Sequence, residues 1–223
     1  MNIRWIHAAL IAALCITAIP LSNLRAQEDA PAKEDILKQT TKLLEDEQYA
    51  AARAQIEETL ASDTAMPRNV KATLLFQLAF SLIELEEYRP SIEAWHRMLT
   101  IVPRHPLVWG NLGWAYYLEG DVDSAIVATE HALDSDATLA FAWGNLGLYR
   151  LAKGDIEGMR SAYEMAAENV EDMGTWNAIQ HDLQELCTDA APEGCAEANA
   201  VIKACCETVD ARLAKAGRNG EER

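Results

Sequence analysis

Apolar residues recur at helical spacing along most of this chain. The first clear run contains Ile36, Leu37, Leu43 and Leu44, which share one side of an α-helix. Similar runs follow, separated by short turns that contain Gly, Asp or Pro. The pattern predicts an all-α protein built from consecutive helix pairs.

One motif occurs twice at a fixed distance. Trp-Gly-Asn-Leu-Gly begins at Trp109 and again at Trp143, 34 residues later, and both copies are followed by Gly-Asp, at Gly120 and Gly154. A fixed period of this length indicates a repeat architecture. A single helix pair cannot bury its own apolar face, so we expect neighbouring pairs to stack and form the core together.

The repeat resembles the tetratricopeptide repeat, whose signature begins Trp-x2-Leu-Gly-x2-Tyr. The first copy carries the matching residues Trp109, Leu112, Gly113, Tyr116, Ala125 and Ala132. The second copy keeps Trp143, Leu146, Gly147, Tyr163 and Ala166. The resemblance implies a right-handed α–α superhelix, a tetratricopeptide solenoid of about four helix pairs.

The repeat period divides the chain into units. Four units are expected at residues 33–66, 72–105, 106–139 and 140–173, with about five residues inserted near Pro67. Glycines explain part of the pattern: Gly113 and Gly147 allow close helix approach, while Gly120 and Gly154 supply a left-handed residue where the first helix ends.

A helical hairpin is expected to cap the solenoid over residues 174–216, followed by a disordered tail over residues 217–223. Thr175 is a candidate N-cap for its first helix. The second helix has one apolar face: Ala198, Ile202, Cys205, Val209 and Leu213. Terminal repeats are atypical because they cover the exposed end of the stack.

Residues 1–26 have the features of a secretory signal peptide: Arg4, an apolar run, Pro20 and a small residue, Ala26, before the expected cleavage site. The sequence therefore predicts a periplasmic or secreted protein. The alternative is an uncleaved anchor in the inner membrane that leaves the chain facing the periplasm.

Acidic residues outnumber basic ones, 35 to 19, and the formal net charge is −16. Such a surface repels nucleic-acid phosphates and anionic lipid headgroups. We therefore expect no nucleic-acid partner, and membrane contact only through an uncleaved N-terminal segment.

Apart from Cys15, which lies in the expected signal peptide, the cysteines cluster near the C-terminus. Cys187 and Cys195 lie on either side of a predicted turn, and an exported protein favours a disulfide between them. Cys205 lies ten residues beyond Cys195, about 15 Å further along the helix, which is too far for a disulfide with Cys187. Cys205 and Cys206 are left free, bonded to each other, or paired between chains.

Motifs for catalysis are missing from the sequence. It has no H-E-x-x-H, G-x-S-x-G or C-x2-C spacing and no phosphate-binding glycine loop. Outside the expected signal peptide its histidines are scattered: His96, His105, His131 and His181. The sequence predicts no enzyme, no metal site and no cofactor.

Tetratricopeptide proteins usually bind peptides or protein segments on the concave face lined by first helices. The resemblance places the following residues in that groove: Phe76, Phe80, Asn111, Trp114, Tyr117, Asn145 and Leu148. Asn111 and Asn145 match a family position that often bonds a peptide backbone. The basic residues of the family's carboxylate clamp are missing beside Gln77, Asn111 and Asn145, so a partner with apolar or aromatic residues is expected.

These features predict a non-enzymatic interaction adaptor or scaffold of the bacterial cell envelope. One alternative is a self-associating structural subunit, whose groove is filled by its own chain or another copy; a buried Trp114 would favour it. Another is a thiol or metal protein that acts through Cys205 and Cys206.

Overall fold

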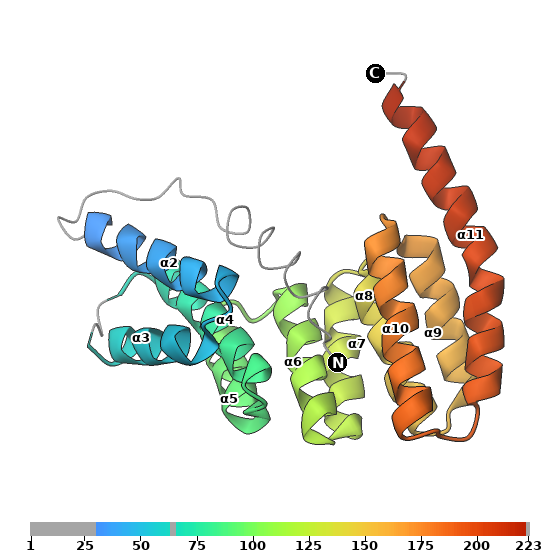
Figure 1. Ribbon diagram of the computed structural model, residues 1–223, viewed down its shortest axis with the longest axis horizontal. Coiled ribbons are helices and arrows are strands. Elements are labelled where there is room, and N and C mark those ends of the chain that lie inside the picture. Colours follow the sequence, from blue (N-terminus) through green and yellow to red (C-terminus); the bar gives the residue numbers. More distant parts are fainter. Residues whose placement is uncertain (1–29, 63–65, 222–223) are drawn as a thin grey trace. The chain divides into compact units, whose positions relative to one another are not determined.

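Helices make up nearly all of the part of the chain that the structure, a computed structural model, describes: residues 30–62 and 66–221 (Figure 1). No strand occurs within those ranges. The expected signal peptide, residues 1–26, lies outside them. The described residues divide into two compact units, and the division falls between Val108 and Trp109, in the first turn of α6.

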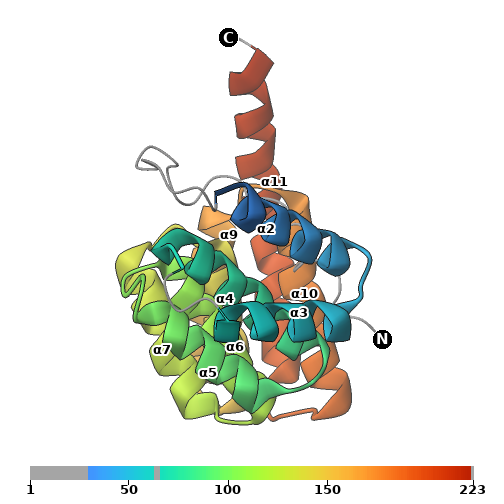
Figure 2. The same cartoon turned by 90° about the vertical axis from the view of Figure 1, so that its left-hand side faces the viewer.

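The first unit contains two helical hairpins (Figure 2). Their helices are α2 (Ala30–Glu45), α3 (Tyr49–Ser62), α4 (Arg68–Glu84) and α5 (Tyr88–Leu99). Helix α4 packs against each of the other three. The core is centred on side chains that are no more than 2% exposed: Ile56, Leu74, Leu75, Leu82 and Trp95. Each hairpin therefore relies on its neighbour to bury its apolar face.

The second unit contains three hairpins. Its helices are α6 (Pro106–Glu119), α7 (Val122–Ser135), α8 (Ala140–Ala152), α9 (Ile156–Asn169), α10 (Met173–Asp189) and α11 (Cys195–Glu221). Helix α10 packs against α8, and α11 packs against α9 (Figure 1). The last hairpin thus continues the stacking of the repeats. Its buried residues share one core with α8 and α9, which includes Tyr163, Trp176, Leu183, Ile202 and Val209.

The glycines of the repeats have the two roles that the pattern predicted, close helix approach and a left-handed helix end. A Cβ on Gly113 would lie 3.0 Å from the carbonyl oxygen of Ala125 on α7, and one on Gly147 would lie 2.8 Å from the Tyr163 ring on α9. Close approach of the two helices in each pair therefore requires glycine. Gly120 and Gly154 have φ values of 91° and 74°.

The same left-handed position recurs in the first unit without glycine. Glu86 lies 34 residues before Gly120 and has a φ of 60°, and Glu47 has a φ of 56°. Glu47 and Glu86 are 39 residues apart, which agrees with the five inserted residues that the sequence indicated. Both glutamates adopt a conformation that side chains with a Cβ disfavour.

Two local expectations differ from the structure. Asp172, not Thr175, is the N-cap of α10: its carboxylate accepts hydrogen bonds from the Thr175 backbone N–H and hydroxyl, both at 2.8 Å. An N-cap side chain reaches the N–H about three residues later, so Thr175 is the donor. Helix α11 continues to Glu221, where the sequence predicted a disordered tail from residue 217. Residues 211–216, just before the predicted tail, are Ala, Arg, Leu, Ala, Lys and Ala, all strong helix formers.

The all-α solenoid of stacked helix pairs is thus confirmed within each unit. Among the helices of residues 30–62 and 66–221, none combines the length and the apolar character needed to cross a bilayer.

Candidate functional site

The predicted groove residues fall in both units and differ in exposure. Phe80, Trp114 and Leu148 are 7%, 6% and 3% exposed, so they offer little surface to a partner. Phe80 packs edge-on against Tyr49, with ring centroids 6.0 Å apart. Four of the predicted residues are half-buried and keep an accessible edge: Phe76 on α4, Asn111 and Tyr117 on α6, and Asn145 on α8.

Gln77 occupies the repeat position of Asn111 and Asn145, 34 and 68 residues earlier. Its side chain is buried and bridges two residues of α2. The Thr40 hydroxyl donates to Gln77 Oε1 at 2.7 Å, and Gln77 Nε2 donates to the Thr41 hydroxyl at 2.9 Å. In the first unit this position therefore joins two first helices instead of meeting a partner.

Aromatic rings line the first helices of the second unit. The Trp114 and Tyr117 rings are 5.5 Å apart between centroids, and Tyr117 stacks on Tyr149 of α8 at 4.8 Å with an interplanar angle of 27°. Offset stacking of this kind holds both rings in place. Tyr149 is wholly buried, so Tyr117 presents the accessible edge of the stack.

The two stacked tyrosines belong to a polar cluster that we call the tyrosine–aspartate cluster: half-buried Tyr117 and Asp182, and fully buried Tyr149 and Tyr163. Its members come from α6, α8, α9 and α10. The Tyr163 hydroxyl and Asp182 Oδ1 are enclosed and have no hydrogen-bond partner within the described residues, while the enclosed Tyr149 hydroxyl faces the Thr129 hydroxyl. Buried polar atoms without partners are uncommon, so this cluster is a candidate site for a bound group.

Electrostatics show that the cluster members influence one another. Burial, and then the neighbouring Glu185 carboxylate, raise the pKa of Asp182 to about 7. Burial also raises the pKa of Tyr163, to which Asp182 and Tyr117 contribute. The pKa of Tyr149 is raised by burial, Tyr117 and Asp182, against an opposing effect of Thr129. The tyrosines therefore remain neutral hydroxyl groups around one carboxyl.

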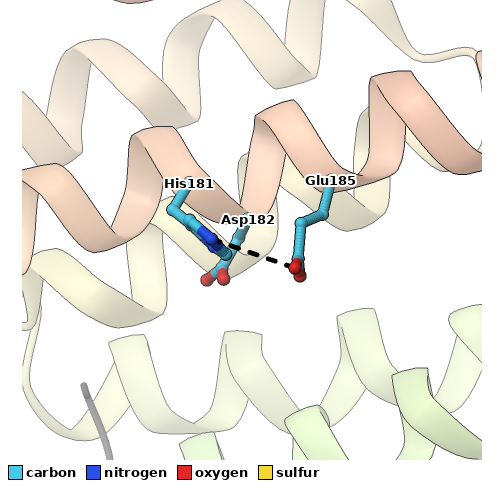
Figure 3. Close-up of side chains that lie close together, drawn as sticks. All are labelled: His181, Asp182 and Glu185. Carbon is cyan, nitrogen blue, oxygen red and sulfur yellow. Dashed lines mark ion pairs between the residues drawn. The ribbon is translucent and has the colours of Figure 1, made fainter. Parts of the chain in front are cut away.

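Asp182 also belongs to a second group on α10, with His181 and Glu185 (Figure 3). One ligand atom from each of the three lies within 4.8 Å of the others. His181 Nε2 is 3.9 Å from Glu185 Oε1, and the two side chains are 49% and 34% exposed. The group is thus open to solvent on one side and borders the tyrosine–aspartate cluster on the other.

The structure joins Cys187 to Cys195 by a disulfide, the pairing that the sequence favoured. Cys205 and Cys206 are free thiols. Cys205 is buried and its Sγ–H points to the Tyr163 carbonyl at 3.8 Å, while Cys206 is half-buried. Burial, followed by nearby Glu164, raises the pKa of Cys205 to about 11.

Sequence reasoning missed both groups on the second unit. The four-residue spacing of His181 and Glu185 would have placed them on one face of a helix and is the signal that was available. No comparable signal joins Tyr149 and Tyr163 to Asp182, because their proximity depends on the packing of three helices.

Comparison with known proteins identifies the fold. No family model matches the chain, and no curated protein matches its sequence. The fold is similar to a crystal structure of MamA (TM-score 0.57, 18% identity, 78% of this chain and 95% of that one). It is also similar to MamA from Desulfovibrio magneticus RS-1 (TM-score 0.51, 16% identity, 69% of this chain and 76% of that one). A third similar structure is the Hsp90 co-chaperone Cns1 from Saccharomyces cerevisiae (TM-score 0.54, 17% identity, 74% of this chain and 50% of that one). At these identities the likeness shows the fold alone, a tetratricopeptide-type helical solenoid.

Proposed function

We propose that the protein is a non-enzymatic adaptor that holds a segment of another protein against the first helices of its second unit. The contrast between Gln77 and Asn145 carries this proposal. The Gln77 amide is already bonded through its oxygen to Thr40 and through its nitrogen to Thr41. The Asn145 amide is half-buried and makes no side-chain hydrogen bond with any described residue, so it is available to a peptide backbone.

The expected partner segment is apolar or aromatic. Tyr117 offers an accessible ring edge that is already immobilised by stacking on Tyr149, so binding costs little side-chain entropy there. One protein with a similar fold, Cns1, is described as an Hsp90 co-chaperone, which agrees with an interaction role.

Export to the cell envelope is part of this proposal and rests on the N-terminal sequence alone. Mass spectrometry of the protein recovered from the periplasmic fraction tests it directly. A mature chain that begins at Gln27 is the expected result, and a full-length chain in the membrane fraction would support the anchored alternative.

A self-associating structural subunit is the second candidate, and the burial of Trp114 favours it. In that case the groove is filled by the chain itself or by another copy. Light scattering across a range of protein concentrations separates the two: a concentration-dependent mass supports self-association, and a constant monomer mass supports the adaptor.

The decisive experiment is site-specific photocrosslinking in living cells. A photoreactive residue replaces Tyr117, and a control replaces Val127 on α7, whose side chain is 55% exposed. A discrete heterologous adduct from position 117 that Asn145→Ala weakens would support the adaptor. An adduct only to the protein itself would support the structural subunit, and equal labelling from both positions would reject groove binding.

A further inference from the structure

His181, Asp182 and Glu185 present one imidazole nitrogen and two carboxylates on the same side of α10 (Figure 3). Two ligands of a zinc ion, each about 2.0–2.2 Å from the metal, lie at most about 4.4 Å apart. The His181–Glu185 distance of 3.9 Å is within that limit, whereas the group as a whole spans up to 4.8 Å, slightly more than the limit. Small side-chain rotations would bring all three donors onto one ion.

The negative charge of this group is not compensated by a basic side chain. No Lys or Arg among the described residues forms an ion pair with Asp182 or Glu185, and the only ion-pair partner of Glu185 there is His181. Two adjacent carboxylates in a partly buried site favour a bound cation, because each repels the other in its absence.

A separate observation on the buried side also indicates a ligand. Asp182 Oδ1 and the Tyr163 hydroxyl are enclosed without a hydrogen-bond partner among the described residues, and Tyr149 and Tyr163, both 0% exposed, interact electrostatically with the Asp182 carboxyl. Metal-binding carboxylates are usually held by hydrogen bonds from a surrounding layer of side chains. Neither phenol hydroxyl bonds to Asp182 in this structure, but both are neutral hydroxyl groups that interact electrostatically with its carboxyl, and such surroundings suit a carboxylate that holds a cation.

From these observations we propose that His181, Asp182 and Glu185 bind one divalent transition-metal cation, with Zn²⁺ as the representative ion. A mixed nitrogen and oxygen donor set suits Zn²⁺ and its first-row neighbours better than Ca²⁺ or Mg²⁺, which prefer oxygen ligands alone. The site would be open to solvent through His181, so further positions on the ion are filled by water. This inference does not depend on the adaptor function.

Isothermal titration of the metal-free, full-length protein with Zn²⁺ at about pH 7.5, where most unperturbed imidazole is neutral, tests the proposal. The expected result is one ion per chain and little competition from Mg²⁺. His181→Ala and Glu185→Gln are each expected to weaken binding by at least about tenfold. The matched controls His131→Ala on α7 and Glu207→Gln on α11, both exposed, are expected to bind as the wild type does.

Thiols need their own control because zinc also binds cysteine. Cys205 is buried and protonated at this pH, since its pKa is raised to about 11, whereas Cys206 is half-buried. Cys206→Ser is therefore expected to leave the affinity unchanged. Circular dichroism of each variant verifies that the helical fold is retained, and the exposure of His181 makes its variant the safest to interpret.

The proposal is overturned if the folded wild-type chain shows no saturable Zn²⁺ binding. It is also overturned if both ligand variants bind as tightly as the wild type, or if Cys206→Ser alone abolishes binding. If the protein does not bind zinc but loses its protein partner when Glu185 is replaced, these carboxylates would instead bind a basic side chain of that partner.

Discussion

Gly144 of α8 lies so close to Ile179 of α10 that a Cβ on the glycine would be 2.5 Å from Ile179 Cγ1. Ile179 is 6% exposed and belongs to the core that α8, α9, α10 and α11 share. The approach of the last hairpin to the repeats therefore depends on the absence of one methyl group.

Gly144→Ala is expected to destabilise the second unit by about 1–3 kcal/mol, because a buried branched side chain must move to admit the methyl group. Gly110→Ala is the matched control: its Cβ would meet the half-buried Phe141 ring at 2.9 Å, and that ring can rotate away. Urea unfolding followed by tryptophan fluorescence measures both. Equal losses for the two variants would show that the Ile179 contact is not limiting.

Glu86→Gly is expected to stabilise the first unit by roughly 0.5–1 kcal/mol, although glycine usually destabilises helical proteins. Glu86 has a φ of 60°, which costs a residue with a Cβ about 1–2 kcal/mol. Glycine relieves this strain and loses part of the gain to its greater freedom in the unfolded chain. Thermal unfolding provides the measurement, and Glu93→Gly, at an exposed position inside α5, should lower stability by about 1 kcal/mol.

Gln77 and Asn145 are expected to give opposite results when each is replaced by alanine. Gln77→Ala removes a buried amide that bonds Thr40 and Thr41, and should cost about 1–3 kcal/mol of stability. Asn145→Ala should change stability by less than about 0.5 kcal/mol.

The partner adduct formed at position 117 completes this comparison. The amount of adduct should fall in Asn145→Ala. In Gln77→Ala it should equal that of the wild type when the yield is divided by the fraction of protein that is folded. A stability loss at Asn145 with no effect on the adduct would mean that its amide serves packing instead.

The two free thiols should differ in reactivity in the native protein. Because burial raises the pKa of Cys205 to about 11, almost none of it is thiolate at about pH 8, and its sulfur is enclosed as well. We expect a thiol-reactive dye to label Cys206 first and Cys205 only after unfolding. Peptide mapping locates the label, and rapid labelling of native Cys205 would revive a thiol function for this pair.

Most of the fold was predictable from the sequence because its signals are local. The repeated motif at Trp109 and Trp143 recurs after 34 residues and marks equivalent helices in consecutive pairs. Gly120 and Gly154 adopt a left-handed conformation where α6 and α8 end, so this signal is local to the helix end. Cys187 and Cys195 are eight residues apart, so the chain between them already holds them close.

The contents of the groove were less predictable because exposure depends on several helices at once. Trp114, Leu148 and Phe80 occupy repeat positions that were expected to line a groove, yet all three are buried. Gln77 differs from Asn145 because α2 places Thr40 and Thr41 against it. Equivalent positions in a repeat thus acquire different environments from their neighbours.

The sequence by itself determined the helix pairs, their period and the disulfide, since each follows from residues within a few helical turns of one another. Only the tertiary structure decided which polar groups meet inside the second unit. Tyr149, Tyr163 and Asp182 come from three helices, and their side chains converge because α10 packs on α8 while Tyr163 crosses Gly147 from α9. Such convergence is a property of packing, which no spacing along the chain encodes.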